Sequence, residues 1–580
     1  MSKTYGPVTP ACDFLHQEKY RARGESFREA CTRIAAALSD SDEHFAVFRE
    51  ILLDQRFLPG GRIQATVGST RGTTPYNCFV SGTIEDSFTH GAGSIMHRAT
   101  EAADTMRLGG GIGYDFSTLR PRGELIRKLQ SHSSGAVSFM DIFNAVGLAT
   151  ASSGHRRGAQ MGVLRCDHPD IEEFVRAKQN STNLTGFNIS VGVTNEFMQA
   201  VEQDSDFDLK WGNGHNKKIY RTVKARALWE LMMRSTYDWS EPGVLFLDTI
   251  NAKNNLWYCE TIAATNPCGE QPLPPYGACL LGSINLVKYL TREAHSSWTF
   301  DYNAFFSDIP HIVRAMDNVI DVARYPLHEQ EQEARSKRRM GLGVTGVANT
   351  LEALGHPYAS RAFRVTLYSL LEGMKNVCYR ASALLAKEKG TFPLFDRDRY
   401  LEGAFVSDLS QDVQELIYAH GIRNSHLLSI APTGTISLSA DNISSGIEPV
   451  YAYEQKRLIN FPSGVQEVTL SDYGTRFLGV RGRVASECSA IEHLSVLIVA
   501  SRHMDSAVSK TCNVRNDYPW EDFKDLYLKA FKNGCKGCTT HREGSLRGAI
   551  ITAVEETPET PILVDASCET DPLTGRRSCE

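Results

Sequence analysis

The sequence predicts an α/β fold with mainly parallel strands. From about residue 60 to residue 540, short apolar runs typical of strands alternate with amphipathic helical segments, and there is no internal repeat. Such alternation indicates strand–helix–strand units, in which each helix returns the chain so that the next strand is parallel. The chain has 580 residues, of which 42% are hydrophobic and 22% charged. This is the composition of a soluble globular protein with several domains, or with one large fold and appendages.

The chain divides into three regions by pattern. Residues 25–57 have the apolar spacing of helices, so we assign residues 1–58 to an N-terminal helical region. Turn-forming residues open the main region, 59–550, and residues 551–580 are rich in Pro, Thr, Glu and Asp, which predicts a flexible tail. Strands of the main region are predicted at 111–116, 187–193, 243–250, 339–346 and 426–434. Helices are predicted at 170–179, 227–239 and 363–390.

Charge and cysteine content restrict the classes of function. A net charge of −6 argues against a general nucleic-acid-binding surface. The first residues lack an apolar core, and no run approaches 18 apolar residues, so we expect neither a signal peptide nor a membrane span. In a chain this long the 14 cysteines do not indicate a secreted disulfide framework. Without an export signal we expect a reducing cytoplasm, where a disulfide is more often catalytic than structural. Cys31, Cys166, Cys378 and Cys488 are predicted to be buried and inert.

The segment NPCGE, residues 266–270, is the strongest candidate for a catalytic site. Its loop presents Cys268 together with a carboxamide, Asn266, and a carboxylate, Glu270, which need partners when buried. Glutamate can act as a base, and asparagine can fix a hydroxyl by a hydrogen bond. The alternative is a buried cysteine in an ordinary loop. The spacing between Cys268 and Cys279 suits no zinc site. No histidine lies nearby in the sequence to deprotonate Cys268 to a thiolate.

Three further segments carry weaker signals. APTGTIS (431–437) suits phosphate oxygens through its backbone N–H groups and hydroxyls, or is a plain strand-to-helix turn. RLGGGIGYDF (107–116) fits no nucleotide-binding glycine motif and predicts only a close backbone approach to another group. CKGCTTHREGS (535–545) has too few ligands for zinc, and a strand-edge pair of Cys535 and Cys538 is favoured. Together these features predict an enzyme that combines a phosphorylated substrate with cysteine redox chemistry.

Four long segments, in the same order along the chain, resemble one family. They are SSGHRRGAQMGVLRCDHPDIEEF (152–174), NPCGEQPLPPYGACLLGSINL (266–286), SKRRMGLGVTGVANTLEALG (336–355) and LLSIAPTGTISLSADNISSGIEPVY (427–451). Over roughly residues 50–550 the chain resembles the catalytic subunit of ribonucleotide reductase, and most closely the adenosylcobalamin-dependent class II enzymes. The resemblance implies a ten-stranded α/β barrel of two five-stranded parallel halves, with an inner finger loop that carries the radical cysteine.

The resemblance implies a role for each of five residues. Cys268 becomes a thiyl radical and takes the hydrogen atom from C3′ of the ribose. Glu270 accepts the proton of the 3′-hydroxyl, and Asn266 holds that hydroxyl. Cys78 and Cys279 supply the proton and electrons with which the 2′-hydroxyl leaves as water, and they end as a disulfide. Hydrogen-atom abstraction requires no thiolate, so no histidine is needed beside Cys268.

The resemblance also implies where nucleotides bind. The substrate pocket is expected to include Asn77, Gly109, Pro267, Gly269, Ala431, Pro432, Thr433, Gly434 and Thr435. A deoxynucleoside triphosphate or ATP, acting as a specificity effector, is expected at Asp86 and Arg120, near the loop SSGHRRGAQM. This effector site lies at a dimer interface in the family, so a homodimer is expected. The N-terminal region is too short for the family's ATP-binding cone, and no overall dATP off-switch is expected.

The disulfide has to be reduced in every turnover. In the family a cysteine pair on the C-terminal tail does this and is recharged by thioredoxin or glutaredoxin. Cys568 and Cys579 are the expected pair, and Cys535 and Cys538 are the competing one. Thiol–disulfide exchange requires only that the tail reach the site.

The radical source follows from resemblance and elimination. Class I enzymes have two adjacent tyrosines near the C-terminus, and the corresponding stretch here, CTTHREGS (538–545), has none. The glycyl-radical motif of class III is absent too. Adenosylcobalamin is therefore the expected cofactor, with no protein-bound metal. One alternative is a class I-type subunit that needs a separate radical-generating subunit. The other, a non-catalytic nucleotide-binding regulator, is disfavoured by the intact set of five residues.

Overall fold

The computed structural model describes residues 5–152, 156–157, 159–179, 183–212, 217–293, 296–461, 464–545, 552–553 and 563–564, and it begins with three helices. These are α1 (Pro10–Tyr20), α2 (Phe27–Leu38) and α3 (Asp42–Leu53). Ser26 and Glu29 form a capping box at the start of α2. Helices α2 and α3 confirm the periodicity of residues 25–57. Helix α1 has no counterpart in the sequence prediction, because its buried face mixes His16 with apolar residues.

The first half of the central sheet consists of five parallel strands. In order of pairing they are β2 (Cys78–Val80), β3 (Gly111–Asp115), β8 (Gln160–Arg165), β9 (Phe187–Val193) and β12 (Gly243–Phe246). Long connections return the chain between these strands, as parallel pairing requires. The hairpin of β10 (Asp206–Trp211) and β11 (Lys218–Lys224) is inserted between β9 and β12.

The second half contains four named strands and one short bridging segment. The named strands are β15 (Ala278–Asn285), β18 (Met340–Thr345), β21 (Thr511–Val514) and β22 (Gly537–Arg542). Strand β15 is parallel to β18, and β21 is parallel to β22. Parallel bridges join Leu342 to Leu428 and Ile430 to Val508. Residues 428–430 therefore fill the place between β18 and the segment that leads into β21.

The two halves run in opposite directions and meet at two seams. At one seam β2 pairs antiparallel with β15, and at the other β12 pairs antiparallel with β22. The pairing therefore continues round the ring, and the predicted ten-stranded α/β barrel of two parallel halves is confirmed. Strand β1 (Phe57–Pro59) also pairs with β15 and joins the N-terminal helices to the barrel.

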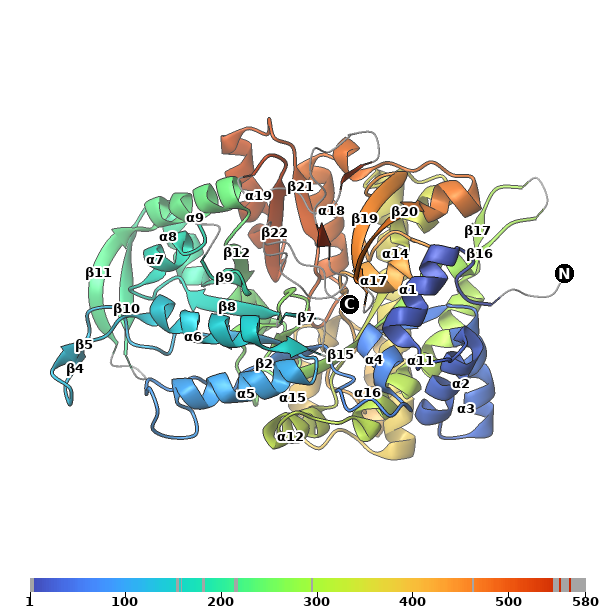
Figure 1. The fold of residues 1–580 in the computed structure, drawn as a ribbon, viewed down its shortest axis with the longest axis horizontal. Helices are drawn as coiled ribbons and strands as arrows, with labels where there is room; N and C mark the ends of the chain where they lie inside the picture. The colour runs from blue at the N-terminus through green and yellow to red at the C-terminus, as the bar shows by residue number, and fades with distance from the viewer. Residues whose placement is uncertain are drawn as a thin grey trace.

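Helices lie outside the strands (Figure 1). The two largest clusters of buried apolar side chains lie on different sides of the strands. Ile112 of β3 and Leu342 of β18 belong to the larger core. A smaller cluster contains Cys78, Cys279 and Leu281 and fills the barrel interior. The helices after the strands of the first half are α5 (Ile95–Arg107), α6 (Ala136–Ala149), α7 (Ile171–Arg176), α8 (Asn195–Gln203) and α9 (Ala225–Trp239). Those of the second half include α11 (Tyr302–Val322), α12 (His328–Lys337), α14 (Arg361–Lys389), α16 (Gln411–His420), α18 (Ala490–Ser501) and α19 (Trp520–Lys532).

A hairpin of β13 (Ala264–Thr265) and β14 (Pro272–Leu273) carries residues 266–271, which we call the finger loop. Glycines of β3 make room for it. A Cβ on Gly113 would lie 1.8 Å from the carbonyl oxygen of Thr265, and one on Gly111 would lie 3.0 Å from the ring of Pro267. The close backbone approach predicted for the segment 107–116 is therefore the packing of β3 against the finger loop.

Gly113→Ala is expected to destabilise the protein by about 1–3 kcal/mol, because overpacking displaces the finger loop or β3. The change would be measured as a lower urea midpoint of unfolding. Gly72→Ala is the matched control, since the nearest atom to its Cβ would be Arg324 Nη1 at 3.8 Å. Equal midpoints for the two variants would mean that the finger loop adjusts without cost.

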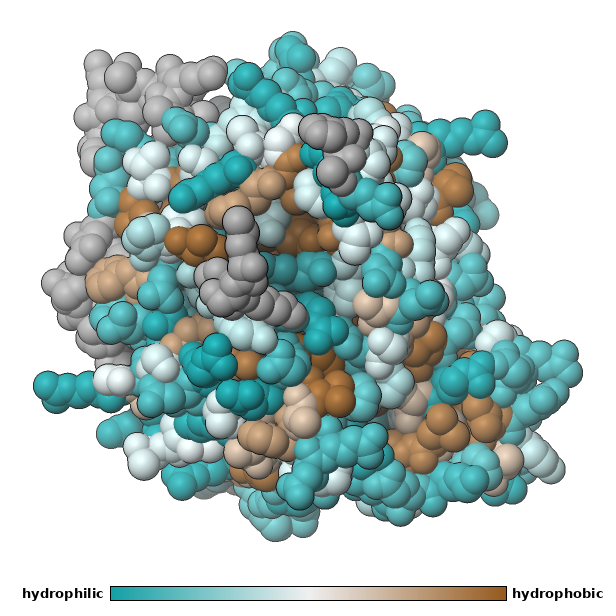
Figure 2. Space-filling model, turned by 90° about the vertical axis from the view of Figure 1, so that its right-hand side faces the viewer, coloured by the Kyte–Doolittle hydropathy of each residue, from teal (hydrophilic) through white to brown (hydrophobic). Residues whose placement is uncertain are grey.

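The outer surface is mostly hydrophilic on the face that carries the N-terminal helices, where apolar side chains form separate small groups (Figure 2). Within the described residues, no helix combines the length and the apolar character needed to cross a membrane. Of residues 551–580, β23 (Thr552–Ala553) and β24 (Leu563–Val564) are described, and both pair with β19 (Glu454–Phe461).

Candidate active site

The finger loop is a closed turn whose side chains are fixed by its own backbone. Gly269 N–H donates to the carbonyl of Asn266 over 3.1 Å, and Gln271 N–H donates to Asn266 Oδ1 over 2.9 Å. Gly269 has a φ of +82°, which favours glycine at this position. The sequence NPCGE therefore folds so that Asn266, Cys268 and Glu270 leave a single tight turn.

Both halves of the barrel hold this turn. From the first half, Asn188 of β9 donates through Nδ2 to the carbonyl of Pro267 over 2.9 Å. From the second half, Ala507 N–H and Ser429 Oγ donate to the carbonyl of Glu270 over 2.9 and 3.0 Å. None of these three anchoring residues stands out in the sequence, because nothing in their local pattern indicates what they face.

Four of the five predicted catalytic residues converge on one side of the finger loop. Asn266 Nδ2 lies 3.2 Å from Cys78 Sγ, and Cys78 Sγ lies 3.8 Å from Glu270 Oε1. Cys78 is in turn the direct cross-strand partner of Cys279 at the seam between β2 and β15. Cα atoms of such partners are about 4.5–5.5 Å apart, which lies within the range of a disulfide. Both cysteines are fully buried free thiols.

Burial sets the protonation of this group. Glu270 is completely buried, and the lost hydration raises the pKa of its carboxyl to about 7, although hydrogen bonds from Asn266 and Cys78 oppose the shift. Burial likewise raises the pKa of Cys78 and of Cys279 well above the usual value. Glu270 Oε2 has no hydrogen-bond partner among the described residues. The group therefore combines two protonated thiols with a carboxyl that titrates near neutrality and has one free oxygen.

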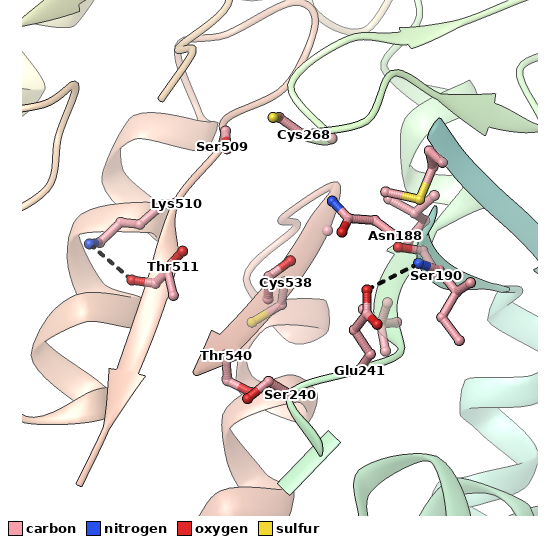
Figure 3. Close-up of a pocket in the computed structure, with 18 of the residues that line it drawn as sticks. Asn188, Ser190, Ser240, Glu241, Cys268, Ser509, Lys510, Thr511, Cys538 and Thr540 are labelled. Atoms are coloured by element: carbon pink, nitrogen blue, oxygen red, sulfur yellow. Dashed lines mark hydrogen bonds between the residues drawn. The ribbon is translucent and has the colours of Figure 1, made fainter. Parts of the chain in front are cut away.

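Cys268 lines a separate cavity (Figure 3). The walls come from β9, β12, β21 and β22, with polar groups of Asn188, Ser190, Lys510 and Thr540. The residues around it include none of Asn266, Glu270, Cys78 and Cys279.

The segment 431–437 lies at the start of helix α17 (Gly434–Leu438), and Ala431 belongs to the interior cluster of the barrel. Thr433 has a left-handed backbone with φ +55°, and its Oγ1 accepts from Gly446 N–H over 2.7 Å. The buried hydroxyl of Thr435 has no partner among the described residues. The turn therefore leaves one buried hydroxyl unsatisfied at the start of α17, which is compatible with the phosphate interpretation.

Asn77 and Gly109 lie beside the β2–β3 side of the barrel. The carbonyl of Asn77 accepts from Gly111 N–H over 2.8 Å, and a Cβ on Gly109 would lie 2.8 Å from the Arg62 guanidinium. Arg62 is a candidate for phosphate contact that the sequence analysis missed, because nothing in its local pattern indicates that the fold brings it to Gly109.

Comparison with known proteins identifies this arrangement. The family model of the ribonucleotide reductase barrel domain matches residues 76–470 and 473–541. The chain belongs to the ribonucleotide reductase family. One similar protein is the vitamin B12-dependent ribonucleoside-diphosphate reductase of Mycobacterium tuberculosis (strain CDC 1551 / Oshkosh), 33% identical over 98% of this chain and 82% of its own. A protein of the same name from Thermoplasma acidophilum is 33% identical over 91% and 69%. The vitamin B12-dependent ribonucleotide reductase of Streptomyces clavuligerus is 26% identical over 92% and 63%.

The two residues predicted for the effector site of this ribonucleotide reductase lie together. Arg120 Nε and Asp86 Oδ2 form an ion pair at 2.8 Å, with about a quarter of each side chain exposed. The loop SSGHRRGAQM lies only partly within the described residues. An effector that binds at Asp86 and Arg120 has to compete with, or bridge, this ion pair.

Of the two candidate cysteine pairs for electron relay, the structure describes only one. Cys568 and Cys579 lie outside the described residues. Cys535 and Cys538 are buried free thiols, and Cys538 lines the cavity of Cys268. Cys31, Cys166, Cys378 and Cys488 are buried, as predicted. No group of three potential metal-binding side chains occurs in the part of the chain that the structure describes.

Proposed function

We propose that this ribonucleotide reductase reduces ribonucleotides to 2′-deoxyribonucleotides through a thiyl radical on Cys268, with adenosylcobalamin as the radical generator. The observation that carries the proposal is the arrangement around the finger loop. Cys268 lines one cavity, while Asn266, Glu270 and the Cys78–Cys279 pair lie together and do not line it. The relatives from Mycobacterium tuberculosis and Thermoplasma acidophilum are named vitamin B12-dependent ribonucleoside-diphosphate reductases, so we assign diphosphates as the substrates.

The chain's own groups account for each proton and electron of the reduction. The Cys268 thiyl takes the hydrogen atom from C3′, while Glu270 accepts the 3′-hydroxyl proton at Oε2 and Asn266 orients that hydroxyl. The 2′-hydroxyl then leaves as water with a proton from Cys78. Cys78 and Cys279 lose two protons and two electrons in total and form a disulfide, and Glu270 returns its proton to the 3′-oxygen. Cys268 finally returns the hydrogen atom to C3′. High thiol pKa values keep both donors protonated until they are needed.

The cavity beside Cys268 suits the adenosyl part of the cofactor. Asn188, Ser190 and Thr511 offer donors and acceptors for a ribose and an adenine. A Cβ on Gly243 would lie 3.0 Å from Ser190 Oγ, so glycine keeps this wall open. Bound there, adenosylcobalamin would supply the radical that oxidises the Cys268 thiol. The vitamin B12-dependent relatives disfavour the class I alternative.

The proposal is tested with the purified chain, a ribonucleoside diphosphate and dithiothreitol, with and without adenosylcobalamin. We expect deoxynucleotide only when the cofactor is present. A parallel reaction with a ribonucleoside triphosphate determines which substrate is preferred. Product that requires a second protein subunit instead of the cofactor would contradict the proposal, and so would the absence of product in all reactions when the fold is intact.

We place the specificity effector at Asp86 and Arg120 and expect a homodimer that forms beside it. Helix α6 supports this, because Leu148 on it is exposed and Val137, Phe139 and Ile142 are only partly buried. Sedimentation with and without a deoxynucleoside triphosphate tests the assignment. A chain that stays monomeric under both conditions would contradict it.

Thioredoxin or glutaredoxin is proposed as the final reductant, and Cys568 and Cys579 as the relay. Both Cys535 and Cys538 are buried, and burial raises the pKa of Cys535 to about 12. A thiol of such high pKa is a poor attacking group near neutral pH, because little thiolate is present. Loss of thioredoxin-supported turnover in Cys568→Ser and Cys579→Ser, with dithiothreitol-supported turnover retained, is expected. The opposite result would favour Cys535 and Cys538.

A further inference from the structure

Arg339, the residue before β18, lies next to β15 at the position of Cys279 and interacts with Cys279 electrostatically. Leu280 and Met340 are partners in the parallel pair of β15 and β18, and Cys279 and Arg339 each precede them by one residue. Met340 and its alternate neighbours face the outer core, so the intervening positions face inward. Gly341, the next inward position, confirms the direction, since its Cβ would lie 2.4 Å from Gln271 Nε2 of the finger loop.

The guanidinium of Arg339 is buried and only partly satisfied. Its side chain is 2% exposed and forms an ion pair with Glu260 through Nη2. Its Nε and both amide atoms of Gln271 are buried without a hydrogen-bond partner among the described residues. Buried donors are nearly always paired, so two unsatisfied donors on one inner face need an explanation. An anion that forms there during turnover would supply the missing acceptor.

Charged groups of both signs affect the pKa of the Cys279 thiol. Burial raises the pKa of this thiol most, and the carboxyls of Asp505, Glu270 and Glu333 raise it further. Arg339 acts in the opposite direction and is the one cation among these causes. The largest effects on Cys78 differ: after burial, Glu270 and Cys279 raise its pKa, and the hydrogen bond from Asn266 lowers it. Negative charge is therefore favoured by a neutral amide at Cys78 and by the cation Arg339 at Cys279.

We propose that Arg339 promotes re-reduction of the Cys78–Cys279 disulfide by holding the thiolate that Cys279 becomes. The disulfide itself rests on the proposed function. A thiolate of an incoming dithiol attacks Cys78 Sγ, its electron pair forms the new S–S bond, and the old bond breaks toward Cys279. The second thiolate of the dithiol then releases Cys78 and completes the oxidation of the reductant. Cys78 and Cys279 each take up one proton, which balances the two that the dithiol lost.

The inference assigns Arg339 a positioning role that does not involve the nucleotide. Leaving-group thiols of lower pKa depart faster in thiol–disulfide exchange. Removing a buried neighbouring cation raises the pKa of an acid by about 1–3 units. Arg339→Gln should therefore slow disulfide cleavage about tenfold, while the hydrogen-abstraction steps at Cys268 keep their rate.

The test measures reduction of the oxidised pair without nucleotide or cofactor, so it does not depend on catalysis. The chain is oxidised with diamide, treated with dithiothreitol and quenched with iodoacetamide, and alkylation of Cys78 and Cys279 is followed by mass spectrometry. Arg339→Gln is expected to slow the appearance of both thiols about tenfold, and Arg339→Lys to restore much of the rate. The pH at which Cys279 is alkylated should rise by about one unit in Arg339→Gln.

Two further variants separate this role from support of the fold. Glu260→Gln removes the carboxylate that competes for Arg339, so its reduction should be at least as fast as in the wild type. Arg338→Gln breaks a neighbouring buried ion pair with Asp317 on the outer side, and it should leave the reduction rate unchanged. The proposal is overturned if Glu260→Gln or Arg338→Gln slows reduction as much as Arg339→Gln. An unchanged rate and alkylation profile in Arg339→Gln would overturn it as well.

Discussion

Cys268→Ser is expected to lower deoxynucleotide formation by more than about 10³-fold, the scale of losing an essential reactive group. The reason is chemical: a serine hydroxyl is a much poorer hydrogen-atom donor than a thiol, so no radical forms at this position. The hydrogen bonds from Asn188, Ala507 and Ser429 hold the backbone of the finger loop, so they do not depend on the sulfur of Cys268. Product is measured by chromatography under the conditions that support the wild type.

The same variant should keep its fold and its affinity for nucleotide. Its urea midpoint and its nucleotide dissociation constant are expected to stay near the wild-type values, because the side chain is replaced by one of similar size. Cys259→Ser is the matched control, since Cys259 is an exposed free thiol nine residues before Cys268. Residual activity above a few per cent in Cys268→Ser, or an equal loss in Cys259→Ser, would contradict the assignment.

The strands of the barrel were predictable where an apolar run coincides with a long paired strand. The alternation of strands and helices predicts parallel pairing, and β18 (Met340–Thr345) lies within the predicted strand 339–346. The predicted strand 426–434 is only a pair of bridges at Leu428 and Ile430, because the chain turns at once into the segment around α17. Apolar runs indicate that a segment is buried, but the length of its pairing depends on neighbours that the sequence does not specify.

The site was predictable in its members but not in its geometry. Cys78 and Cys279 are 201 positions apart, and only the antiparallel seam makes them direct partners. The glycines of β3 indicate that another group approaches the strand closely. The sequence does not show that this group is the finger loop. Arg339 shows the limit most clearly, because its sequence neighbours are basic and its importance comes from the strand beside it.

Glu270→Gln should reduce the turnover number by about 10²–10³-fold, the contribution of a general base. The wild-type rate should rise with pH through about 7, the pKa to which burial raises this carboxyl, because only the carboxylate accepts the 3′-hydroxyl proton. The amide cannot accept the proton, so this limb of the pH profile should be lost in the variant. Single-turnover rates from about pH 5.5 to 8.5 would measure both effects, in the range where such a base titrates.

The same carboxyl predicts an opposite effect on stability. In the unfolded chain Glu270 ionises near the ordinary glutamate pKa of 4.5, whereas in the folded protein burial raises the pKa to about 7. Between these values the folded state binds more protons than the unfolded state, so the free energy of unfolding falls as pH rises and levels off above about 7. The loss amounts to at most about 3 kcal/mol, and Glu270→Gln should abolish it. Between acid pH and pH values above about 7, the wild type should therefore lose more free energy of unfolding than the inactive variant does.

Glu352→Gln is the control that separates catalysis from burial. Glu352 is also buried with its pKa raised by desolvation, but it accepts from the N–H groups of Tyr358 and Arg483, away from the finger loop. Its variant should lose some pH dependence of stability and keep its activity. If Glu270→Gln instead retains the wild-type turnover number, Glu270 is not the base. If its urea midpoint follows pH as in the wild type, the carboxyl does not titrate near neutrality, and another group must cause any rise of the rate through pH 7.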